Sequence, residues 1–212
     1  MTTFSASFQP SLLDDSTEVD VGPLGDTVRR VPLSAGAWLD LRRGWVSGAD
    51  TLFDRLRHSV PWQAERRPMY DRVVNVPRLL HFVGERTPLP DPALVSAKQV
   101  LNQHYASELG ESFATAGLCL YRDGHDSVAW HGDRVGRGNT QDTMVAILVL
   151  GAPRALALRP IGGGSSHRYD LGHGDLVVMG GSCQRTWEHC VPKTARAVGP
   201  RISVQFRPRG VR

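Results

Sequence analysis

Two short stretches of this chain place a histidine and an aspartate two residues apart: His131-Gly132-Asp133 and His173-Gly174-Asp175. Residues at this spacing lie on the same face of a β-strand, so each stretch could present an imidazole and a carboxylate side by side. With a second histidine, such a pair forms the facial triad of non-haem iron oxygenases and leaves positions open for other ligands. The chain has eight histidines and fifteen aspartates, so neither short motif identifies a metal site by itself.

The surroundings of the two pairs favour the first. In LGHGDLVVMG a glycine on each side of His173 signals a turn that enters a strand, so we interpret Asp175 as a turn residue. In SVAWHGDRV the glycine between the pair leaves the opposite face of the strand open. His189, in TWEHCVPK, follows His131 by 58 positions (189 − 131) on a separate candidate strand. We therefore predict that His131, Asp133 and His189 bind the metal. We expect the remaining histidines to be ordinary core or surface residues: His58, His81, His104, His125 and His167.

A third segment, PRISVQFRP, has the pattern of a strand with one apolar and one polar face. Ile202, Val204 and Phe206 alternate with Arg201, Ser203, Gln205 and Arg207. A guanidinium stays charged and binds a carboxylate through two parallel hydrogen bonds, so this face could hold a small diacid. The two arginines lie ~20 Å apart in an extended chain, so their side chains would have to converge or the strand to bend. The alternative is a solvent-facing edge strand with two ordinary surface arginines.

The elements that must position these residues change in kind along the chain. Short runs rich in Val, Ile and Leu alternate with turns in the second half, at 118–121, 127–130, 144–150, 154–159, 176–179, 186–191 and 201–206. Strands at such intervals, with no helix-length apolar period between them, indicate a sandwich or jelly roll. The segment 161–168 is expected to be a flexible hairpin tip, because it lacks the Gly-Lys-Ser/Thr ending of a phosphate loop.

The first half is expected to be mixed, with a strand or two within residues 1–32. Ser47-Gly48-Ala49-Asp50 has the form of a capping box, and a helix should follow it. Its apolar positions are Leu52, Phe53 and Leu56. Asp91-Pro92 should open a second helix that runs to about Leu109. Its apolar stripe would be Leu94, Val95, Leu101 and Tyr105. The predicted fold is α+β but mainly β: a double-stranded β-helix (jelly roll) with the helices packed on the outside of one sheet.

The bulk properties are those of a single globular domain of 212 residues, with 41% hydrophobic and 22% charged residues. No apolar run approaches the ~20 residues of a membrane span, and the N-terminus lacks the pattern of a secretory signal. Three cysteines at irregular spacing indicate free thiols in a reducing compartment. We expect a cytoplasmic monomer with no membrane partner.

The mildly basic charge, +4 with a pI near 9.3, permits an anionic partner. One stretch interleaves basic and aromatic side chains, a combination that suits phosphate contact and base stacking. Its members are Arg66, Arg67, Arg72, Arg78 and Arg86, with Trp62, Tyr70 and Phe82 among them. A solvated surface with ordinary core aromatics explains the same pattern equally well.

Four motifs in this order resemble those of the AlkB family of nucleic-acid dealkylases, over roughly Val60 to Pro208. LYRDGHDSVAWHGD resembles the segment that leads into the family's His-x-Asp, and TWEHCVPK resembles the segment with its distal histidine. PRISVQFR is similar to the family's strand with two arginines six positions apart. VPRL at 76–79, followed by Gly84-Glu85, resembles the Pro-Arg segment of its nucleotide-recognition region.

The resemblance implies Fe(2+), 2-oxoglutarate and O2 as cofactor and co-substrates, and alkylated DNA or RNA as the partner. Arg201, assisted by Tyr121, would pair with the distal carboxylate of 2-oxoglutarate, and Arg207 would lie near the carboxylate beside the metal. About 1–115 would be an N-terminal extension with the helices and the nucleotide-recognition segment, and about 116–212 the jelly-roll catalytic core. A base must be unstacked to reach a buried metal. Candidate substrate contacts are Trp62, Tyr70, Arg78 and Val135.

Two positions depart from the family pattern. Cys119 stands where the family usually has an asparagine, two residues before Tyr121, and Val135 stands where an acidic residue faces the base. The leading hypothesis is oxidative dealkylation of N-alkylated bases in DNA or RNA, as in DNA alkylation repair. These departures motivate an alternative, the same oxygenase chemistry on a non-repair substrate. A non-catalytic nucleic-acid-binding jelly roll is a third hypothesis, but such a module has no need of three metal ligands and two arginines together.

Overall fold

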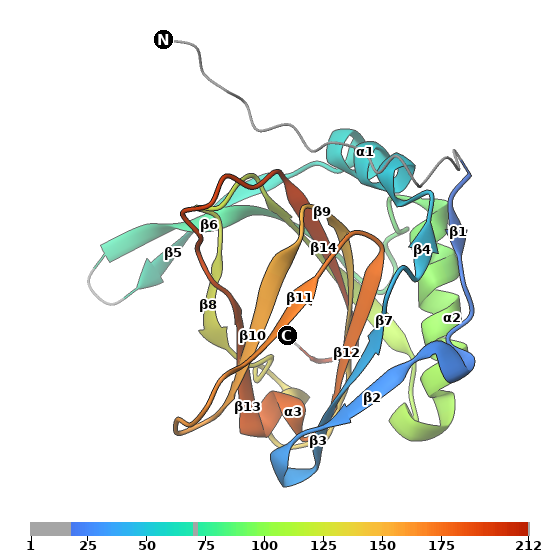
Figure 1. Ribbon diagram of the computed structural model, residues 1–212, viewed down its shortest axis with the longest axis vertical. Helices are drawn as coiled ribbons and strands as arrows, with labels where there is room; N and C mark the ends of the chain where they lie inside the picture. The colour runs from blue at the N-terminus through green and yellow to red at the C-terminus, as the bar shows by residue number, and fades with distance from the viewer. Residues whose placement is uncertain (1–17, 70–71, 212) are drawn as a thin grey trace.

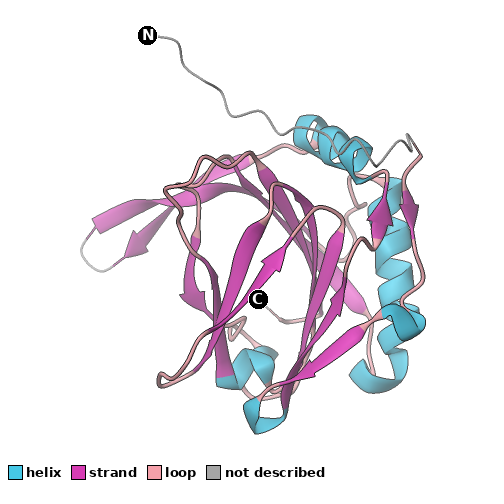
Figure 2. Cartoon of the chain, in the orientation of Figure 1, coloured by secondary structure: helices cyan, strands magenta, loops and turns pink. Residues whose placement is uncertain are grey.

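The fold is mainly β in the computed structural model, which describes residues 18–69 and 72–211 (Figures 1 and 2). The helices are α1 (Ala49–Ser59), α2 (Pro92–Leu109) and the short α3 (Cys183–Thr186). The larger sheet contains, in spatial order, β2 (Arg29–Pro32), β3 (Ala37–Arg42), β12 (Asp175–Gly181), β9 (Val145–Gly151), β14 (Arg201–Pro208), β7 (Phe113–Tyr121), β6 (Arg72–Val83) and β5 (Gln63–Met69). The smaller sheet contains β11 (His167–Leu171), β10 (Arg154–Pro160), β13 (Trp187–Val191) and β8 (Val128–His131). A separate pair joins β1 (Asp20–Val21) to β4 (Val46–Ser47).

All these strand pairs are antiparallel, which confirms the prediction of a mainly β, jelly-roll type of fold. Each apolar run expected to be a strand overlaps one in the structure. Within the described residues, no helix is both long enough and apolar enough to span a membrane.

The larger sheet separates two hydrophobic cores. One face packs with apolar side chains of the helices, such as Leu52 of α1 and Leu101 of α2. The other face meets the smaller sheet, where Leu158 and Val191 lie in one cluster with Val149. Because successive residues of a strand point to opposite faces, central strands such as β7 and β9 contribute to both cores: Leu118 and Leu148 lie in the first, and Cys119 and Val149 lie in the second.

β14 lies in the middle of the larger sheet, between β9 and β7, and this position excludes the solvent-facing edge strand. Ile202, Val204 and Phe206 are fully buried in the core that contains the helices. The polar residues of β14 therefore face the smaller sheet, in the interior of the molecule. Arg201 is only 2% exposed there, so it is a buried charge and not a surface arginine.

The N-terminus of α2 matches the prediction, but the N-terminus of α1 does not. No capping box forms before α1: its N-cap is Gly48, with φ +62° and no side-chain cap. A Cβ at Gly48 would lie 2.3 Å from the Glu18 carbonyl oxygen, so close backbone packing and the left-handed conformation both require glycine. The predicted start of α2 is confirmed, because Asp91 accepts a hydrogen bond from the Ala93 N–H at 2.8 Å. Val95 was wrongly placed on the buried stripe of α2; it is 40% exposed, and Ala97 is buried instead.

The strand content of the first half exceeds the prediction. β5 and β6 form a hairpin that extends from the body of the fold in Figure 1, and β3 pairs with β12. β11 begins at His167, so the expected hairpin tip is shorter than 161–168. The strands expected within residues 1–32 are β1 and β2, while residues 1–17 lie outside the described part.

Candidate metal and co-substrate site

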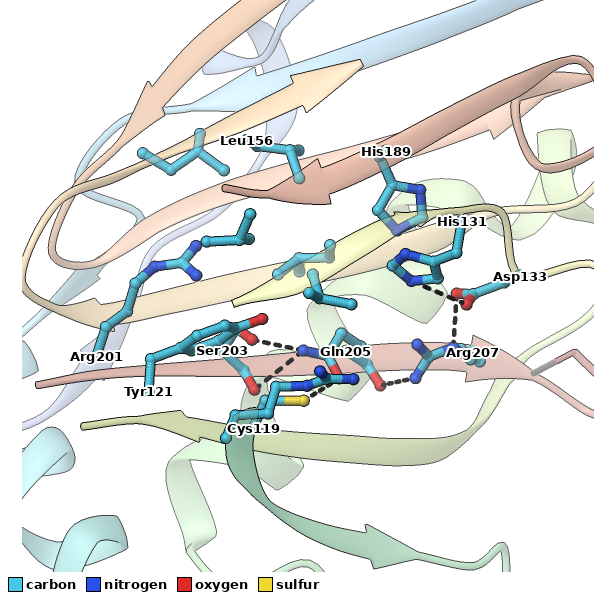
Figure 3. A pocket seen from close by; sticks show the side chains of 15 residues that line it. Cys119, Tyr121, His131, Asp133, Leu156, His189, Arg201, Ser203, Gln205 and Arg207 are labelled. Atoms are coloured by element: carbon cyan, nitrogen blue, oxygen red, sulfur yellow. Dashed lines mark hydrogen bonds and ion pairs between the residues drawn. The ribbon is translucent and has the colours of Figure 1, made fainter. Parts of the chain in front are cut away.

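One cavity between the two sheets contains the side chains of most predicted site residues (Figure 3). The space between these side chains measures about 510 Å³, part of which is open solvent at the mouth. His131, Asp133 and His189 lie at one end, Arg201 and Tyr121 lie at the other, and Ser203 and Gln205 lie between them (Figure 3). The remaining lining residues are Arg78, Cys119, Val128, Ile147, Leu156, Leu171, Val191 and Arg207.

The three predicted metal ligands come from two neighbouring strands and one loop. His131 pairs with His189 across β8 and β13, and their ring centroids are 4.3 Å apart. β8 ends at His131, so Asp133 does not share its strand, contrary to the prediction. A turn in which the Arg134 N–H donates to the Gly132 carbonyl brings the Asp133 carboxylate back to 4.0 Å from His131 Nε2.

Gly132 is needed for a reason that differs from the predicted one. The space beside the Gly132 Cα is occupied and not open as predicted: a Cβ there would lie 2.7 Å from the Gln184 carbonyl oxygen and 3.2 Å from the Trp187 carbonyl oxygen. The side chain of Gln184 accepts a hydrogen bond from the Asp133 N–H at 3.0 Å. The segment after β8 therefore packs directly on the backbone of α3, which holds Asp133 in place.

A β-bulge in β8 turns His131 toward the cavity. His189 pairs with His131 and Val191 with Val128, so three residues of β8 span the length of two in β13. Because of the extra residue, both Val128 and His131 line the cavity although they are three positions apart. His131 Nδ1 lies 2.8 Å from the Ala129 carbonyl, which favours a proton on Nδ1 and leaves Nε2 as the acceptor.

The electrostatics of this end favour ligands in their metal-binding forms. Burial would raise the pKa of the Asp133 carboxyl, but Arg207, whose Nε donates to Asp133 at 2.8 Å, outweighs it and the pKa lies below its usual range. Burial lowers the pKa of His189 to about 3, so its imidazole is neutral near pH 7. Metals bind neutral imidazole and ionised carboxylate.

The three side chains are of the chemical types that bind Fe(2+): two imidazoles and one carboxylate lie at one end of the cavity. No three described His, Cys, Asp or Glu side chains are placed to hold a metal ion without movement. Adjacent ligands of a metal with bonds of about 2.1 Å lie about 3 Å apart. Binding therefore requires His131 and Asp133 to approach each other from 4.0 Å, and the His131 side chain, 36% exposed, has room to move.

The opposite end of the cavity fits a carboxylate. The Arg201 guanidinium is buried, yet its Nε and Nη1 have no hydrogen-bond partner. Its carbon lies 5.3 Å from the centroid of the Tyr121 ring, which is a stacking partner but not an anion. A buried charge without a counter-ion is costly, and a bidentate carboxylate would satisfy both nitrogens. Burial lowers the pKa of Arg201, but an arginine remains charged in proteins.

Cys119, which stands where the family usually has an asparagine, has a polar partner in the cavity. Its thiol lies 3.6 Å from Gln205 Oε1, and the amide nitrogen of Gln205 donates to Ser203 Oγ at 2.5 Å. The two polar residues in the middle of β14 therefore bond to each other, and Gln205 also accepts a hydrogen bond from the thiol. All three cysteines of the chain are free and buried: Cys119, Cys183 and Cys190.

The second His-Gly-Asp has a structural role. Asp175 begins β12, and its carboxylate accepts hydrogen bonds from the N–H groups of Gly172 (2.8 Å) and Gly44 (2.9 Å). His173 Nδ1 accepts from the Gly151 N–H at 2.7 Å. Asp175 therefore holds the turn that enters β12, but it is the first residue of the strand and not a turn residue as predicted; neither His173 nor Asp175 lines the cavity.

The four candidate substrate contacts are dispersed. Arg78 lines the cavity, and its Nη1 donates to the Ser127 carbonyl at 3.0 Å. Val135 is 68% exposed just after the Asp133 turn. Trp62 packs against the helix-side core and donates from Nε1 to the Arg57 carbonyl at 3.1 Å. Tyr70 lies outside the described residues.

A mainly antiparallel jelly roll with two histidines, an aspartate and a buried arginine in one cavity defines a class, the metal-dependent oxygenases that use a 2-oxo acid. The model of the 2OG-Fe(II) oxygenase superfamily matches residues 83–207. Alpha-ketoglutarate-dependent dioxygenase alkB homolog 3 of Bos taurus is 31% identical over 217 residues, which cover 91% of this chain and 72% of that protein. DNA oxidative demethylase ALKBH2 of Arabidopsis thaliana is 27% identical over 206 residues, covering 80% of this chain and 63% of that protein.

The fold is also similar to a solved structure of OsALKBH1, with a TM-score of 0.59 at 15% identity, covering 85% of this chain and 100% of that one. The chain belongs to the 2OG-Fe(II) oxygenase superfamily and, within it, to the AlkB-like proteins. It is a 2-oxoglutarate-dependent dioxygenase, and its cofactor and co-substrates are Fe(2+), 2-oxoglutarate and O2.

Proposed function

We propose that this dioxygenase oxidatively dealkylates N-alkylated bases in DNA or RNA, and so acts in the repair of alkylation damage. The observation that carries the proposal is the arrangement of the cavity: the buried Arg201 lies at its closed end, and the three proposed metal ligands, of which His131 is the most exposed, lie at the other end. The name of the Arabidopsis relative, a DNA oxidative demethylase, supports the choice of substrate.

His131, Asp133 and His189 would hold the iron, which when bound would supply oxidation of a substrate carbon by dioxygen, coupled to conversion of 2-oxoglutarate to succinate and CO2. Arg201 would bind the distal carboxylate of 2-oxoglutarate beside Tyr121. Arg207 keeps Asp133 ionised and oriented through its 2.8 Å hydrogen bond. The closed end excludes water from the arginine, which strengthens its pairing with a carboxylate.

The substrate would approach from the side of His131, because this is the most exposed of the three ligands. A base must leave its stack to reach the iron, and the exposed Val135 would meet it with an apolar surface. Arg78 would lie near the boundary between base and co-substrate, since it lines the same cavity as Arg201. Trp62 remains a candidate for contact with the nucleic-acid strand outside the cavity.

The wider predictions are part of this proposal. Residues 1–115 would form the N-terminal extension that recognises the nucleotide, and 116–212 the catalytic core. The helices would form an outer layer on the larger sheet, consistent with the core that Leu52 and Leu101 share with Val204. We also propose that the protein acts as a cytoplasmic monomer; the three free cysteines agree with a reducing compartment.

Succinate formation with Fe(2+), ascorbate and 2-oxoglutarate tests the function. We expect oligonucleotides with N1-methyladenine or N3-methylcytosine to stimulate succinate and aldehyde release together, and unmodified oligonucleotides to do neither. Single- and double-stranded DNA and RNA should be compared. Turnover with non-nucleic substrates alone would establish the alternative, in which the same chemistry serves another purpose. The family membership does not favour that alternative, nor the non-catalytic module.

A pair of matched variants tests the assignment of the metal site. His131→Ala removes a cavity imidazole, and we expect it to abolish turnover. His173→Ala changes the other His-Gly-Asp, whose contacts are structural, and most of the specific activity should remain. Loss of activity in the second variant but not in the first would mean that the metal site is wrongly assigned.

A further inference from the structure

The residues that immediately follow or precede the three proposed ligands form a second cluster on the outer face of the smaller sheet. Trp130 precedes His131, Arg134 follows Asp133, and Glu188 precedes His189. Neighbours along a strand point to opposite faces, so Trp130 and Glu188 point away from the cavity that His131 and His189 line. Arg134 follows the turn after β8 and meets Glu188 on the same outer face. Arg159 of β10 is the register partner of Glu188 and completes the cluster, which we call the outer cluster (Trp130, Arg134, Arg159 and Glu188).

Glu188 joins the members of the outer cluster. One carboxylate oxygen, Oε1, accepts from Arg134 Nη2 at 3.3 Å. The other, Oε2, accepts from Arg159 Nε and Nη2 at 3.2 and 3.0 Å. The Arg159 guanidinium carbon in turn lies 4.3 Å from the centroid of the Trp130 ring, a cation–π contact. Through one carboxylate, the strand of His189 is tied to the loop of Asp133 and to the strand of His131.

The contacts of Glu188 matter because Asp133 lies in the loop after β8 and not in a strand. Its backbone N–H bonds to Gln184, and its carboxylate bonds to Arg207, but the next residue is fixed from outside by Glu188. The Glu188 side chain is only 18% exposed, so its two ion pairs are stronger than those of a fully solvated pair. Glu188 also offsets the positive charges of Arg134 and Arg159, which would otherwise oppose a divalent cation nearby.

We propose that Glu188 is a positioning residue for the metal centre: acting through Arg134, Arg159 and Trp130, it holds the three ligand-bearing segments at the spacing that a divalent metal requires. The inference rests on the proposed metal ligands. Outer-shell residues of this kind change metal affinity by about 10- to 100-fold when they are removed. Glu188→Gln keeps the shape of the side chain but removes its charge, so it isolates the ion pairs.

The test measures Mn(2+) binding to the whole chain by titration calorimetry and by the electron paramagnetic resonance spectrum of the bound ion. We expect Glu188→Gln to bind Mn(2+) about 10-fold more weakly and with an altered spectrum. Glu108→Gln is the matched control, because it breaks the ion pair between Glu108 of α2 and Arg30 of β2 while leaving the cavity untouched. It should bind Mn(2+) like the wild type, and both variants should unfold within a few degrees of it.

Four results would overturn the inference or its basis. Unchanged Mn(2+) affinity and spectrum in Glu188→Gln would reject the positioning role. Equal loss in Glu188→Gln and Glu108→Gln would show a general effect of broken ion pairs and would also reject it. If the wild type itself bound no Mn(2+), the proposed metal site would fail first. Should Glu188→Gln not fold, Arg134→Gln breaks only the connection to the Asp133 loop, and unchanged Mn(2+) affinity there would count against the role.

Discussion

At the scale of single residues, two buried arginines of similar exposure have opposite surroundings. Arg154 donates to three backbone carbonyls, those of Asp123, Asp126 and Pro192, at 3.0, 3.0 and 2.7 Å. Arg201 leaves two nitrogens without partners at the closed end of the cavity. A satisfied buried charge contributes to stability, whereas an unsatisfied one costs stability until a ligand arrives.

This contrast predicts that Arg154→Met will destabilise the folded protein and that Arg201→Met will not. Without ligand, Arg201→Met should be as stable as the wild type or more stable, by up to about 3 kcal/mol. Arg154→Met should lose about 3 kcal/mol, because three carbonyls lose their donor. The Michaelis constant for 2-oxoglutarate should rise about 30-fold or more in Arg201→Met, as for a broken buried charge pair. Urea unfolding and succinate assays measure both quantities, and equal destabilisation by the two variants would contradict the proposed ligand role of Arg201.

At the scale of elements, the loop between β7 and β8 places the edge strand that carries His131. Asp126 organises this loop: its carboxylate accepts from the backbone N–H and the guanidinium of Arg122 at 2.8 to 2.9 Å. Two contacts with Pro77-Arg78 of β6 attach the end of the loop, since the Ser127 N–H donates to Pro77 at 2.8 Å and the Ser127 carbonyl accepts from Arg78. β8 therefore depends on contacts with a strand of the other sheet.

Asp126 of this loop should make the stability of the folded protein depend on pH. Burial would raise the pKa of Asp126, but its hydrogen bonds and the charge of Arg122 outweigh burial, so the pKa lies below the ordinary 3.8. The folded state then binds fewer protons than the unfolded state, so the contribution is complete above pH 3.8 and is lost as the pH falls through the lowered pKa. Asp126→Asn should cost about 1 kcal/mol near pH 7 and progressively less in acid. Thermal unfolding of both proteins between pH 7 and 3 measures this, and a constant difference would contradict it.

At the scale of the whole molecule, the cavity joins the two sheets of the jelly roll. The smaller sheet and the loop after β8 supply the metal ligands, and the larger sheet supplies both arginines of β14. Ligands that occupy this cavity therefore connect elements that otherwise meet mainly through apolar contacts. A ligand that binds only the folded state must raise its stability by mass action.

Metal and co-substrate should accordingly stabilise the protein separately. At free Mn(2+) of 100 times its dissociation constant, the gain is about 2.7 kcal/mol, or about 5–10 °C in the unfolding temperature of a chain this long. Adding 2-oxoglutarate should raise it further. Arg201→Met should keep the metal shift and lose most of the 2-oxoglutarate shift, while His131→Ala should lose the metal shift. A thermal scan of the three proteins that showed the same shifts would refute the division of the cavity into two ends.

Local patterns in the sequence determined the elements and the chemical types of the site. Alternation predicted the two faces of β14, and Asp91-Pro92 predicted the start of α2, because both signals depend only on neighbouring residues. Tertiary structure alone decided that β14 is central, that a bulge turns His131 inward and that Asp133 is held by α3 and not by a strand. These features depend on which distant strands pair and how closely two backbones approach, and no local pattern contains that information. His131 and Asp133 are thus brought together by a turn and not by the alternation of side chains along a strand.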